Sequence, residues 1–201
     1  MKLLWSSRSP FARKVMVAAH ELGIGETITL ERVLVATDIA NPAVLASNPL
    51  GQIPTLIRDD GVALFDSSVI IGWLDATHGG TLVPPAGEAR WSALRREALG
   101  DGLAQLNRGR LAEGRRGDKA LPAYEHALAT KTAAVLDNLE FDPPRATRAD
   151  IGAIAVAVAL AHLDFRFPDS AWRQGRPRLA DWFGAFDQRP SMRATLPEDV
   201  Y

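Results

Sequence analysis

Three separated segments of this chain carry groups that can bind a small, charged, peptide-like molecule. Ser9-Pro10 begins a helical pattern, which places a hydroxyl at a helix N-terminus. Pro54 stands immediately before a strand-like run and can leave the backbone N–H and C=O groups beside it exposed to a ligand. Asp66-Ser67 stands where a later helix should begin, and this acid–hydroxyl pair can hold an amine or a carboxylate. We therefore expect the three segments to line one pocket.

Each of these residues also has a purely structural explanation. A serine at a helix N-cap stabilises the helix by ~1 kcal/mol, so capping alone would account for Ser9. Asp66-Ser67 can likewise serve only as a helix cap. Proline is tolerated at the first residue of a strand, and an X-Pro bond is cis in only about 5–6% of cases in folded proteins, so Pro54 need not be unusual. From the residues alone, both interpretations stand.

The composition narrows the classes of function. The chain has 201 residues and 47% apolar content, which is enough for one large domain or two small ones. Its net charge of −1 gives no electrostatic footprint for a nucleic acid. It contains no cysteine, which excludes disulfides, thiolate metal sites and a protein thiol nucleophile. Its histidines are scattered without ligand spacing, so we expect no metal site.

The hydropathy pattern predicts neither export nor a membrane anchor. The first residues turn polar by Ser6, without the long apolar stretch and small-residue cleavage site of a signal peptide. The longest apolar run, residues 151–161, is too short to span a bilayer. We expect a cytoplasmic protein that does not bind membranes.

Strand and helix patterns alternate over residues 1–78, which we expect to form an α/β domain with the element order β-α-β-α-β-β-α. A helix between the first two strands predicts that these strands are parallel, and the last two strands should form a hairpin that adds an antiparallel edge. The expected strands are residues 2–6, 27–35, 55–58 and 62–65, and the expected helices are residues 10–22, 42–47 and 67–77.

Residues 79–87 are rich in glycine and proline and are expected to form a linker. Residues 88–201 show helical patterns and no convincing strand, which predicts an all-helical second domain. Glycines weaken the first of these patterns, and residues 108–119 are polar enough for a bend or loop. Thr147 and Asp150 match a capping box that opens a helix apolar on all sides, which should be central and buried. The expected helices are residues 88–113, 122–139, 150–163 and 178–188.

Four motifs, in this order and at these separations, resemble those of cytosolic glutathione transferases over essentially the whole chain. They are Ser9-Pro10-Phe11, Asn48-Pro49-Leu50-Gly51-Gln52-Ile53-Pro54, Phe65-Asp66-Ser67, and the cap formed by Thr147 and Asp150. Each motif is weak by itself, whereas the four together are specific. The resemblance implies a thioredoxin-like first domain that binds glutathione and a helical bundle that supplies a wall for the second substrate. Within the family, the chain resembles the small bacterial YibF-like transferases.

The resemblance makes Ser9 the catalytic residue. Its hydroxyl would donate a hydrogen bond to the sulfur of glutathione and so favour the thiolate, which is the nucleophilic form of a thiol. Ser6 and Ser7 are alternatives, but they precede the helix start and match the motif less well. Without a cysteine in the chain, disulfide exchange through a protein thiol is not expected.

The resemblance also assigns roles to the residues expected to bind glutathione. A cis peptide bond before Pro54 would let the N–H and C=O groups of Ile53 pair with the cysteinyl backbone of the ligand. Asp66-Ser67 would hold the γ-glutamyl end, the aspartate through the ammonium and the serine through the carboxylate. Gln52 would reach the glycyl end. Phe11 either lines the pocket of the second substrate or packs inward.

The function implied by the resemblance is a homodimeric glutathione transferase with a role in detoxification. The glutathione thiolate would attack a small hydrophobic electrophile, and no metal is implied. Two alternatives stay open, because a fold does not determine a function. One is a glutathione-dependent peroxidase or dehalogenase of the same fold, and the other is a non-catalytic module that binds glutathione or regulates another protein.

Overall fold

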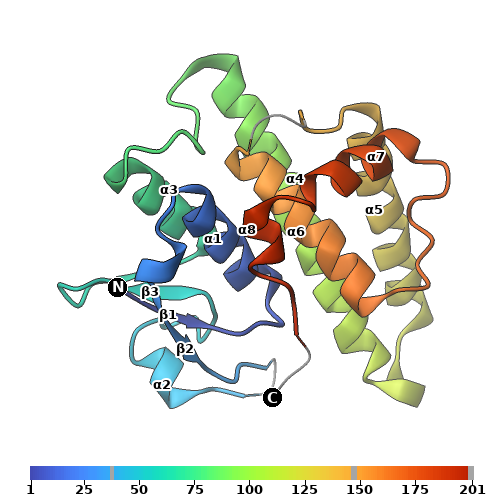
Figure 1. Cartoon of the computed structure of the whole chain (residues 1–201). Helices are drawn as coiled ribbons and strands as arrows, with labels where there is room; N and C mark the ends of the chain where they lie inside the picture. Colours follow the sequence, from blue (N-terminus) through green and yellow to red (C-terminus); the bar gives the residue numbers. More distant parts are fainter. Residues whose placement is uncertain (37–38, 146–148, 199–201) are drawn as a thin grey trace. The chain divides into compact units, whose positions relative to one another are not determined.

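The computed structural model describes residues 1–36, 39–145 and 149–198 (Figure 1). By their contacts these residues form two compact units. The first contains residues 1–85 together with the residues from Pro190 onward, and the second is Ala86–Arg189. The C-terminal residues, which the sequence analysis grouped with the helices, therefore group with the α/β part. No helix in the described ranges is long and apolar enough to cross a membrane.

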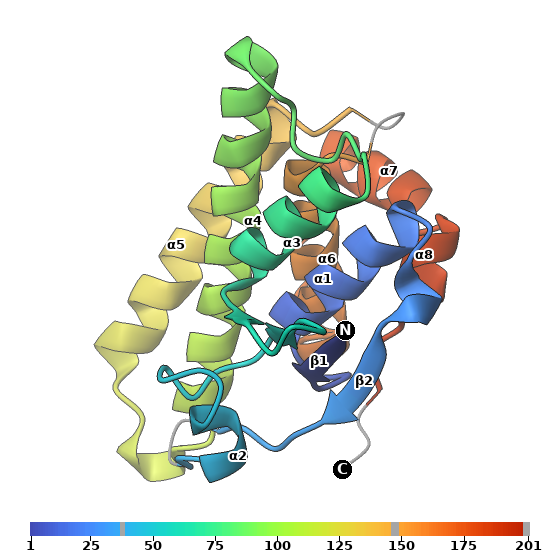
Figure 2. The ribbon, with the colours of Figure 1, turned by 90° about the vertical axis from the view of Figure 1, so that its left-hand side faces the viewer.

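The first unit has the expected thioredoxin-like arrangement. Its sheet has 4 strands in the order β2-β1-β3-β4. β1 and β2 are parallel, as expected for two strands joined through a helix, and the other pairs are antiparallel. α1 and α3 lie side by side on one face, and α2 lies on the other (Figures 1 and 2). The elements are β1 (Lys2–Trp5), α1 (Pro10–Glu21), η1 (Gly25–Thr27), β2 (Thr29–Arg32), α2 (Pro42–Leu45), β3 (Thr55–Ile57), β4 (Ala63–Leu64), α3 (Ser67–Thr77) and α8 (Pro190–Arg193).

Apolar side chains cover both faces of this sheet, because successive residues of a strand point to opposite sides. On one face Leu4 packs against Val44 of α2 and against Ile53. Leu3 and its cross-strand partner Leu56 point to the other face, and both are fully buried. Burial on both faces fixes the register of the pairing, since a slip of one residue would exchange the two faces.

Most expected elements of this unit are confirmed, and their ends differ for structural reasons. β2 is shorter than the expected 27–35, because η1 occupies its start and its partner β1 ends at Trp5, opposite Arg32. α1 is preceded by Ser9 as its N-cap, and α3 spans the predicted residues. The short helix α8 was not predicted.

The second unit is all-helical, as expected. Its central helix α6 is buried on nearly all sides and packs along α4. α4 continues to Gly114 without the bend or loop expected from residue 108, and a short 3-10 helix follows it. The elements are α4 (Gly87–Gly114), η2 (Gly117–Lys119), α5 (Pro122–Phe141), α6 (Ile151–Arg166) and α7 (Pro177–Phe186).

The N-cap of α6 differs from the expected capping box. The carboxylate of Asp150 accepts a hydrogen bond from the N–H of Ala153 at 2.9 Å, so this residue is itself the N-cap. The sequence analysis expected Thr147 to be the N-cap and Asp150 to be its partner three residues later. Thr147 lies outside the described residues. Aspartate is as favourable at an N-cap as serine, so Asp150 can cap the helix by itself. The helix therefore begins at Ile151, one residue later than predicted.

The segment expected to be a linker is held to α3 by a buried carboxylate. Asp75 is 6% exposed. It accepts hydrogen bonds from the backbone N–H groups of Leu82 at 2.8 Å and Val83 at 3.1 Å. The chain that leaves α3 is thus fixed by specific contacts, although its composition predicts a flexible connection.

Two glycines allow α4 and α6 to approach closely. A Cβ atom at Gly100 would lie 2.4 Å from the carbonyl carbon of Ala155. A Cβ atom at Gly152 would lie 2.4 Å from the carbonyl oxygen of Ala93. Glycine weakens a helix by about 0.5–1 kcal/mol, yet at these places any side chain would force the two backbones apart. Helix packing therefore explains why α4 keeps a glycine that its own propensity disfavours.

This packing predicts opposite effects for two substitutions on one helix. Gly100→Ala should lower the free energy of unfolding by about 1–3 kcal/mol, because the new methyl group collides with the α6 backbone. Gly102→Ala should raise it by about 0.5–1 kcal/mol, because no atom lies within 4 Å of its Cβ and only helix propensity changes. Urea unfolding of both variants measures the difference. Equal effects would contradict the close packing of α4 on α6.

Candidate functional site

The first part of the site is the turn that leads from β1 into α1. The N–H of Ser9 donates to the carbonyl of Ser6 at 3.0 Å, which closes a four-residue turn. Ser9 has extended backbone angles, and its Oγ accepts a hydrogen bond from the N–H of Ala12 at 3.3 Å. It is therefore the predicted N-cap, with Pro10 as the first helical residue. Because the hydroxyl only accepts in this cap, its proton is left to donate to a ligand.

The structure distinguishes the three serines of this turn. The hydroxyl of Ser7 donates to the carbonyl of Glu198 at 3.1 Å, which uses its proton within the protein. The Oγ of Ser6 accepts from the N–H of Arg8 at 3.3 Å, inside the turn. Ser9 alone of the three stands at the N-terminus of α1, where the helix dipole favours an anion. The geometry thus distinguishes Ser9 from the two alternatives as the hydroxyl at a helix N-terminus.

The second part of the site is the loop that ends at Pro54. The peptide bond between Ile53 and Pro54 is cis, as the resemblance implied. Both residues are largely buried, whereas Gln52 is exposed. The hydroxyl of Thr55 donates to the carbonyl of Gln52 at 2.9 Å. Within the described residues, neither the N–H nor the C=O of Ile53 forms a hydrogen bond, so these groups are available to a peptide ligand.

Asn48 organises this loop, a role that the sequence analysis did not assign. It is 1% exposed. Its amide donates to the carbonyl of Gln52 and to the hydroxyl of Thr55, both at 3.0 Å, and its carbonyl oxygen accepts from the N–H of Leu50 at 3.0 Å. One buried side chain thus connects the start of the motif with the first residue of β3. Its place in a proline- and glycine-rich motif was the available signal.

The third part of the site is the N-terminus of α3. Asp66 is the exposed N-cap, and its Oδ1 accepts from the N–H groups of Ser68 at 3.1 Å and Val69 at 3.5 Å. The peptide bond between Phe65 and Asp66 is cis. Ser67 is only 2% exposed, so its contact with any ligand is confined to the small surface at the helix end. Capping and binding are compatible, because capping leaves the second carboxylate oxygen of Asp66 free to meet a cation.

A buried lysine joins the two helices of the site. Lys14 of α1 is 1% exposed, and its Nζ lies 3.4 Å from the Oγ of Ser68 in the first turn of α3. An ammonium beside a helix N-terminus adds to the positive potential there. The sequence alone does not show which group this lysine contacts, and nothing in it distinguishes Lys14 from a solvated side chain.

The sheet brings these parts to one end. Leu4 of β1 pairs with Thr55 of β3, so the turn after β1 lies beside Pro54. Leu56 pairs with Leu64 of β4, so the start of α3 follows on the other side of the same strand. The strand pairing therefore places Ser9, Pro54 and the Asp66-Ser67 pair at the same end of the sheet. Phe11 is half-buried in the first turn of α1, which is compatible with either of its expected roles.

The arrangement is suited to a small peptide that carries both charges. Two helix N-termini attract anionic groups, the carboxylate of Asp66 attracts a cation, and the loop before Pro54 offers backbone partners to an extended chain. None of the three features recognises such a molecule by itself. Their placement at one end of a sheet makes the combination specific.

Comparisons with known proteins show which proteins the chain is similar to. Residues 8–77 match the family model described as glutathione S-transferase, N-terminal domain. A glutathione transferase family member from Pseudomonas fluorescens Pf-5, solved with bound glutathione, is 39% identical, with 98% of each chain covered and a TM-score of 0.94. A glutathione S-transferase from Methylobacillus flagellatus KT, solved with GSH bound, is 34% identical, with 98% of this chain and 99% of that chain covered and a TM-score of 0.85.

A curated relative is also similar to glutathione transferases, although its name states no activity. The chain is 28% identical over 205 residues to the uncharacterized GST-like protein YibF of Escherichia coli (strain K12), with 98% of each chain covered. This match agrees with the expected likeness to small bacterial members.

The role of Asn48 can be tested through stability. Asn48→Ala should lower the free energy of unfolding by about 2–4 kcal/mol, because it removes several buried hydrogen bonds and leaves partners unpaired. The matched control is Asn41→Ala, which removes the N-cap of α2 and an exposed hydrogen bond to the carbonyl of Leu34. It should cost only about 1 kcal/mol, because the partners left behind are accessible to water. Thermal or urea unfolding gives both values. Similar losses in the two variants would show that Asn48 does not hold the loop.

Proposed function

We propose that this chain, which belongs to the glutathione transferase family, binds glutathione at the described site and transfers it to a small electrophile. The observation that carries the proposal is the convergence of Ser9, the cis bond before Pro54 and the Asp66 carboxylate at one end of the sheet. The bound glutathione in the Pseudomonas and Methylobacillus relatives supports it.

In this proposal glutathione lies along the site as an added extended strand. Its cysteinyl N–H and C=O pair with the backbone of Ile53, in the manner of a peptide that extends a sheet. Its ammonium pairs with Asp66, and its γ-glutamyl carboxylate meets the N-terminus of α3 at Ser67. Gln52, exposed in the same loop, contacts the glycyl end. The sulfur then lies toward Ser9.

The proposed catalysis rests on ionising the thiol. A free thiol has a pKa of about 8.5, and one pKa unit corresponds to ~1.4 kcal/mol. A hydrogen bond from the Ser9 hydroxyl to the thiolate contributes about 1.5–3 kcal/mol, and the N-terminus of α1 adds ~0.3–1 kcal/mol. Together these terms lower the pKa of the glutathione thiol to about 6–7, so the thiolate predominates at neutral pH.

The thiolate then forms a carbon–sulfur bond with the electrophile. The thiol proton passes to solvent, and the electron pair of the new bond comes from sulfur. Either a leaving group departs with the electrons of its own bond, or an activated double bond accepts them and takes up a proton. A second structure of the Pseudomonas relative holds S-(propanoic acid)-glutathione, in which sulfur carries a small acid. This supports a pocket that accepts a small group on sulfur.

The remaining parts of the proposal follow the family. We place the protein in the cytoplasm as a homodimer with a role in detoxification, acting on a small hydrophobic electrophile without a metal. Peroxide reduction or dehalogenation at the same site, and binding without catalysis, are the competing functions. Calorimetric titration with glutathione, followed by a screen of electrophiles and peroxides, separates them. Saturable binding without any turnover would favour the non-catalytic module.

Ser9 is tested by removing its hydroxyl. Ser9→Ala should raise the pKa of the bound glutathione thiol by about one to two units, because the hydrogen bond to the thiolate is lost. Turnover with 1-chloro-2,4-dinitrobenzene should therefore fall by about one to two orders of magnitude below neutral pH, and the deficit should close at alkaline pH. The affinity for glutathione should change little. The pH profile of kcat, with the ultraviolet absorbance of the bound thiolate, measures this.

The capping role of Ser9 is separated with a second variant. Glycine caps a helix almost as well as serine, whereas alanine costs about 1 kcal/mol. Ser9→Gly should thus lose as much turnover as Ser9→Ala, but it should unfold at a higher temperature than Ser9→Ala. If loss of turnover followed the loss of stability instead, the hydroxyl would have no part in the chemistry.

Asp66 is tested by changing its charge while keeping its cap. Asn is as good an N-cap as Asp, so Asp66→Asn should leave thermal stability nearly unchanged. The affinity for glutathione should fall by about tenfold, ~1.4 kcal/mol, because the ammonium loses its charged partner. Asp66→Ala should lose both affinity and stability. Unchanged glutathione affinity in Asp66→Asn, measured by calorimetry, would reduce this residue to a helix cap.

A further inference from the structure

The C-terminal segment, residues 190–198, lies along the whole of α1 in the antiparallel direction. Ser191, near its beginning, donates a hydrogen bond to the carboxylate of Glu21 at the end of α1. Glu198, at its end, accepts a hydrogen bond from Ser7, which precedes α1. The contacts of Arg13, in the first turn of the helix, lie between these two. The segment is therefore attached at both ends of α1 and at its first turn, which Ser9 caps.

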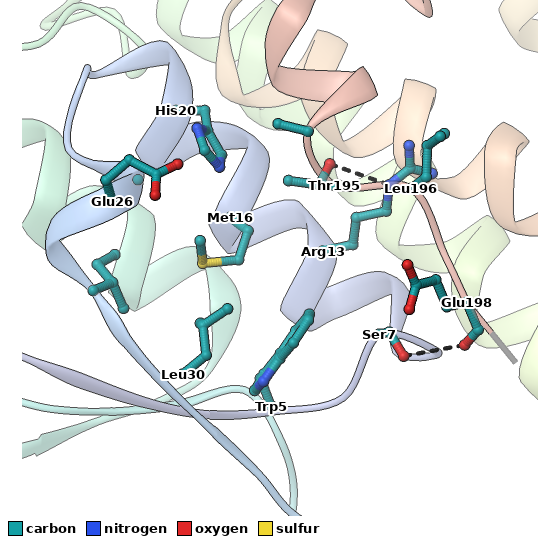
Figure 3. Close-up of a pocket in the computed structure, with 13 residues that line it drawn as sticks. Trp5, Ser7, Arg13, Met16, His20, Glu26, Leu30, Thr195, Leu196 and Glu198 are labelled. Atoms are coloured by element: carbon teal, nitrogen blue, oxygen red, sulfur yellow. Dashed lines mark hydrogen bonds between the residues drawn. The ribbon is translucent and has the colours of Figure 1, made fainter. Parts of the chain in front are cut away.

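Arg13 attaches the first turn of α1 to this segment. Its side chain is only 4% exposed. Its guanidinium donates to the carbonyl of Met192 at 3.1 Å and to the hydroxyl of Thr195 at 3.4 Å, and Figure 3 shows the second of these contacts. The backbone N–H of the same arginine donates to the carbonyl of Ser9 at 3.0 Å. The residue that closes the first turn of α1 is thus itself held by the C-terminal segment.

Ser7 attaches the turn that precedes α1 to the same segment. It lies inside the turn that the hydrogen bond between Ser6 and Ser9 closes, and its hydroxyl donates to the carbonyl of Glu198 at 3.1 Å (Figure 3). Because a hydrogen bond closes this turn, a contact made by its second residue, Ser7, also restricts the movement of its last residue, Ser9. Ser9 therefore stands between two residues that contact the same segment.

Met192 is fully buried at the start of the segment, whereas residues 194–198 are held by these hydrogen bonds more than by close packing. A cavity of about 270 Å³ lies between it and the rest of the first unit. Trp5, Met16 and Leu30 line one side of the cavity, and Leu196 and Glu198 line the other (Figure 3). Leu196 is 51% exposed, so it does not anchor the chain by burial. The loss of one hydrogen bond from residues 194–198 is consequently not compensated by neighbouring apolar contacts.

We propose that the C-terminal segment positions the Ser9 hydroxyl for its contact with the glutathione sulfur, and that Ser7 and Arg13 are the positioning residues. The inference rests on the proposed function. A hydrogen bond to sulfur requires a fixed direction of the hydroxyl, and a cap that rotates or shifts weakens it. Residues far apart in the sequence thereby act on the same catalytic group.

Ser7→Ala tests the proposal without removing any group that meets the ligand. We expect the pKa of the bound glutathione thiol to rise, and kcat below neutral pH to fall roughly two- to tenfold, the range for one hydrogen bond of ordinary strength. Glutathione affinity should stay as in the unmodified protein. Ser7→Thr keeps the donor and should restore the original thiol pKa. Thr195→Val removes an acceptor of Arg13 and should change the thiol pKa in the same direction as Ser7→Ala.

The matched control is Thr27→Ala, which also removes an exposed hydroxyl that donates to a backbone carbonyl in the first unit. It should change thermal stability by a similar small amount and leave the thiol pKa unchanged. If Ser7→Ala and Thr195→Val match this control in both thiol pKa and kcat, the segment does not position Ser9. If the unmodified protein binds glutathione but leaves its thiol un-ionised at neutral pH, both this inference and the proposed role of Ser9 are wrong. Lack of any glutathione binding would overturn the proposed function as a whole.

Discussion

The site depends on the register of β3, which pairs antiparallel with β1 on one side and with β4 on the other. β1 leads into the N-terminus of α1, and β4 leads into that of α3. The shared pairing therefore brings both helix starts to the end of the sheet where Pro54 precedes β3. The apolar core enforces this register, because a slip of one residue would turn buried Leu56 to the opposite face. Core packing and the binding site are thus fixed by the same constraint.

The parts of the site that the sequence predicts are those with local signals. A serine before a proline marks a helix start, and Asp66-Ser67 before an apolar helical pattern marks another. The cis bond before Pro54 did not follow from composition or spacing, and only the resemblance to a family indicated it. The element order and the parallel pairing of the first strands followed from alternating periodicities and the handedness of crossovers.

The parts that the sequence did not predict depend on partners far along the chain. From the sequence, Lys14 looks like a solvated side chain. In the structure its Nζ lies beside the Oγ of Ser68 in α3. Gly100 weakens α4 by propensity, yet the α6 backbone 55 residues later requires it. Nothing in the residues of the C-terminal segment indicates that it forms α8 or that it lies along α1. Local rules can identify a cap or a turn, but not which distant segment will hold it in place.

The two helix starts differ in charge, and this difference gives the site a direction. α1 has a neutral cap and no acidic residue in its first turn, so its dipole is left uncompensated and favours an anion. α3 carries the acidic cap Asp66, which offsets part of its dipole and presents a negative charge to the surface. An extended ligand with an ammonium at one end and an ionisable sulfur in its middle is best accommodated with the ammonium at α3 and the sulfur at α1. Reversing it would place the sulfur anion beside a carboxylate and the ammonium against a positive helix end, which is unfavourable at both positions.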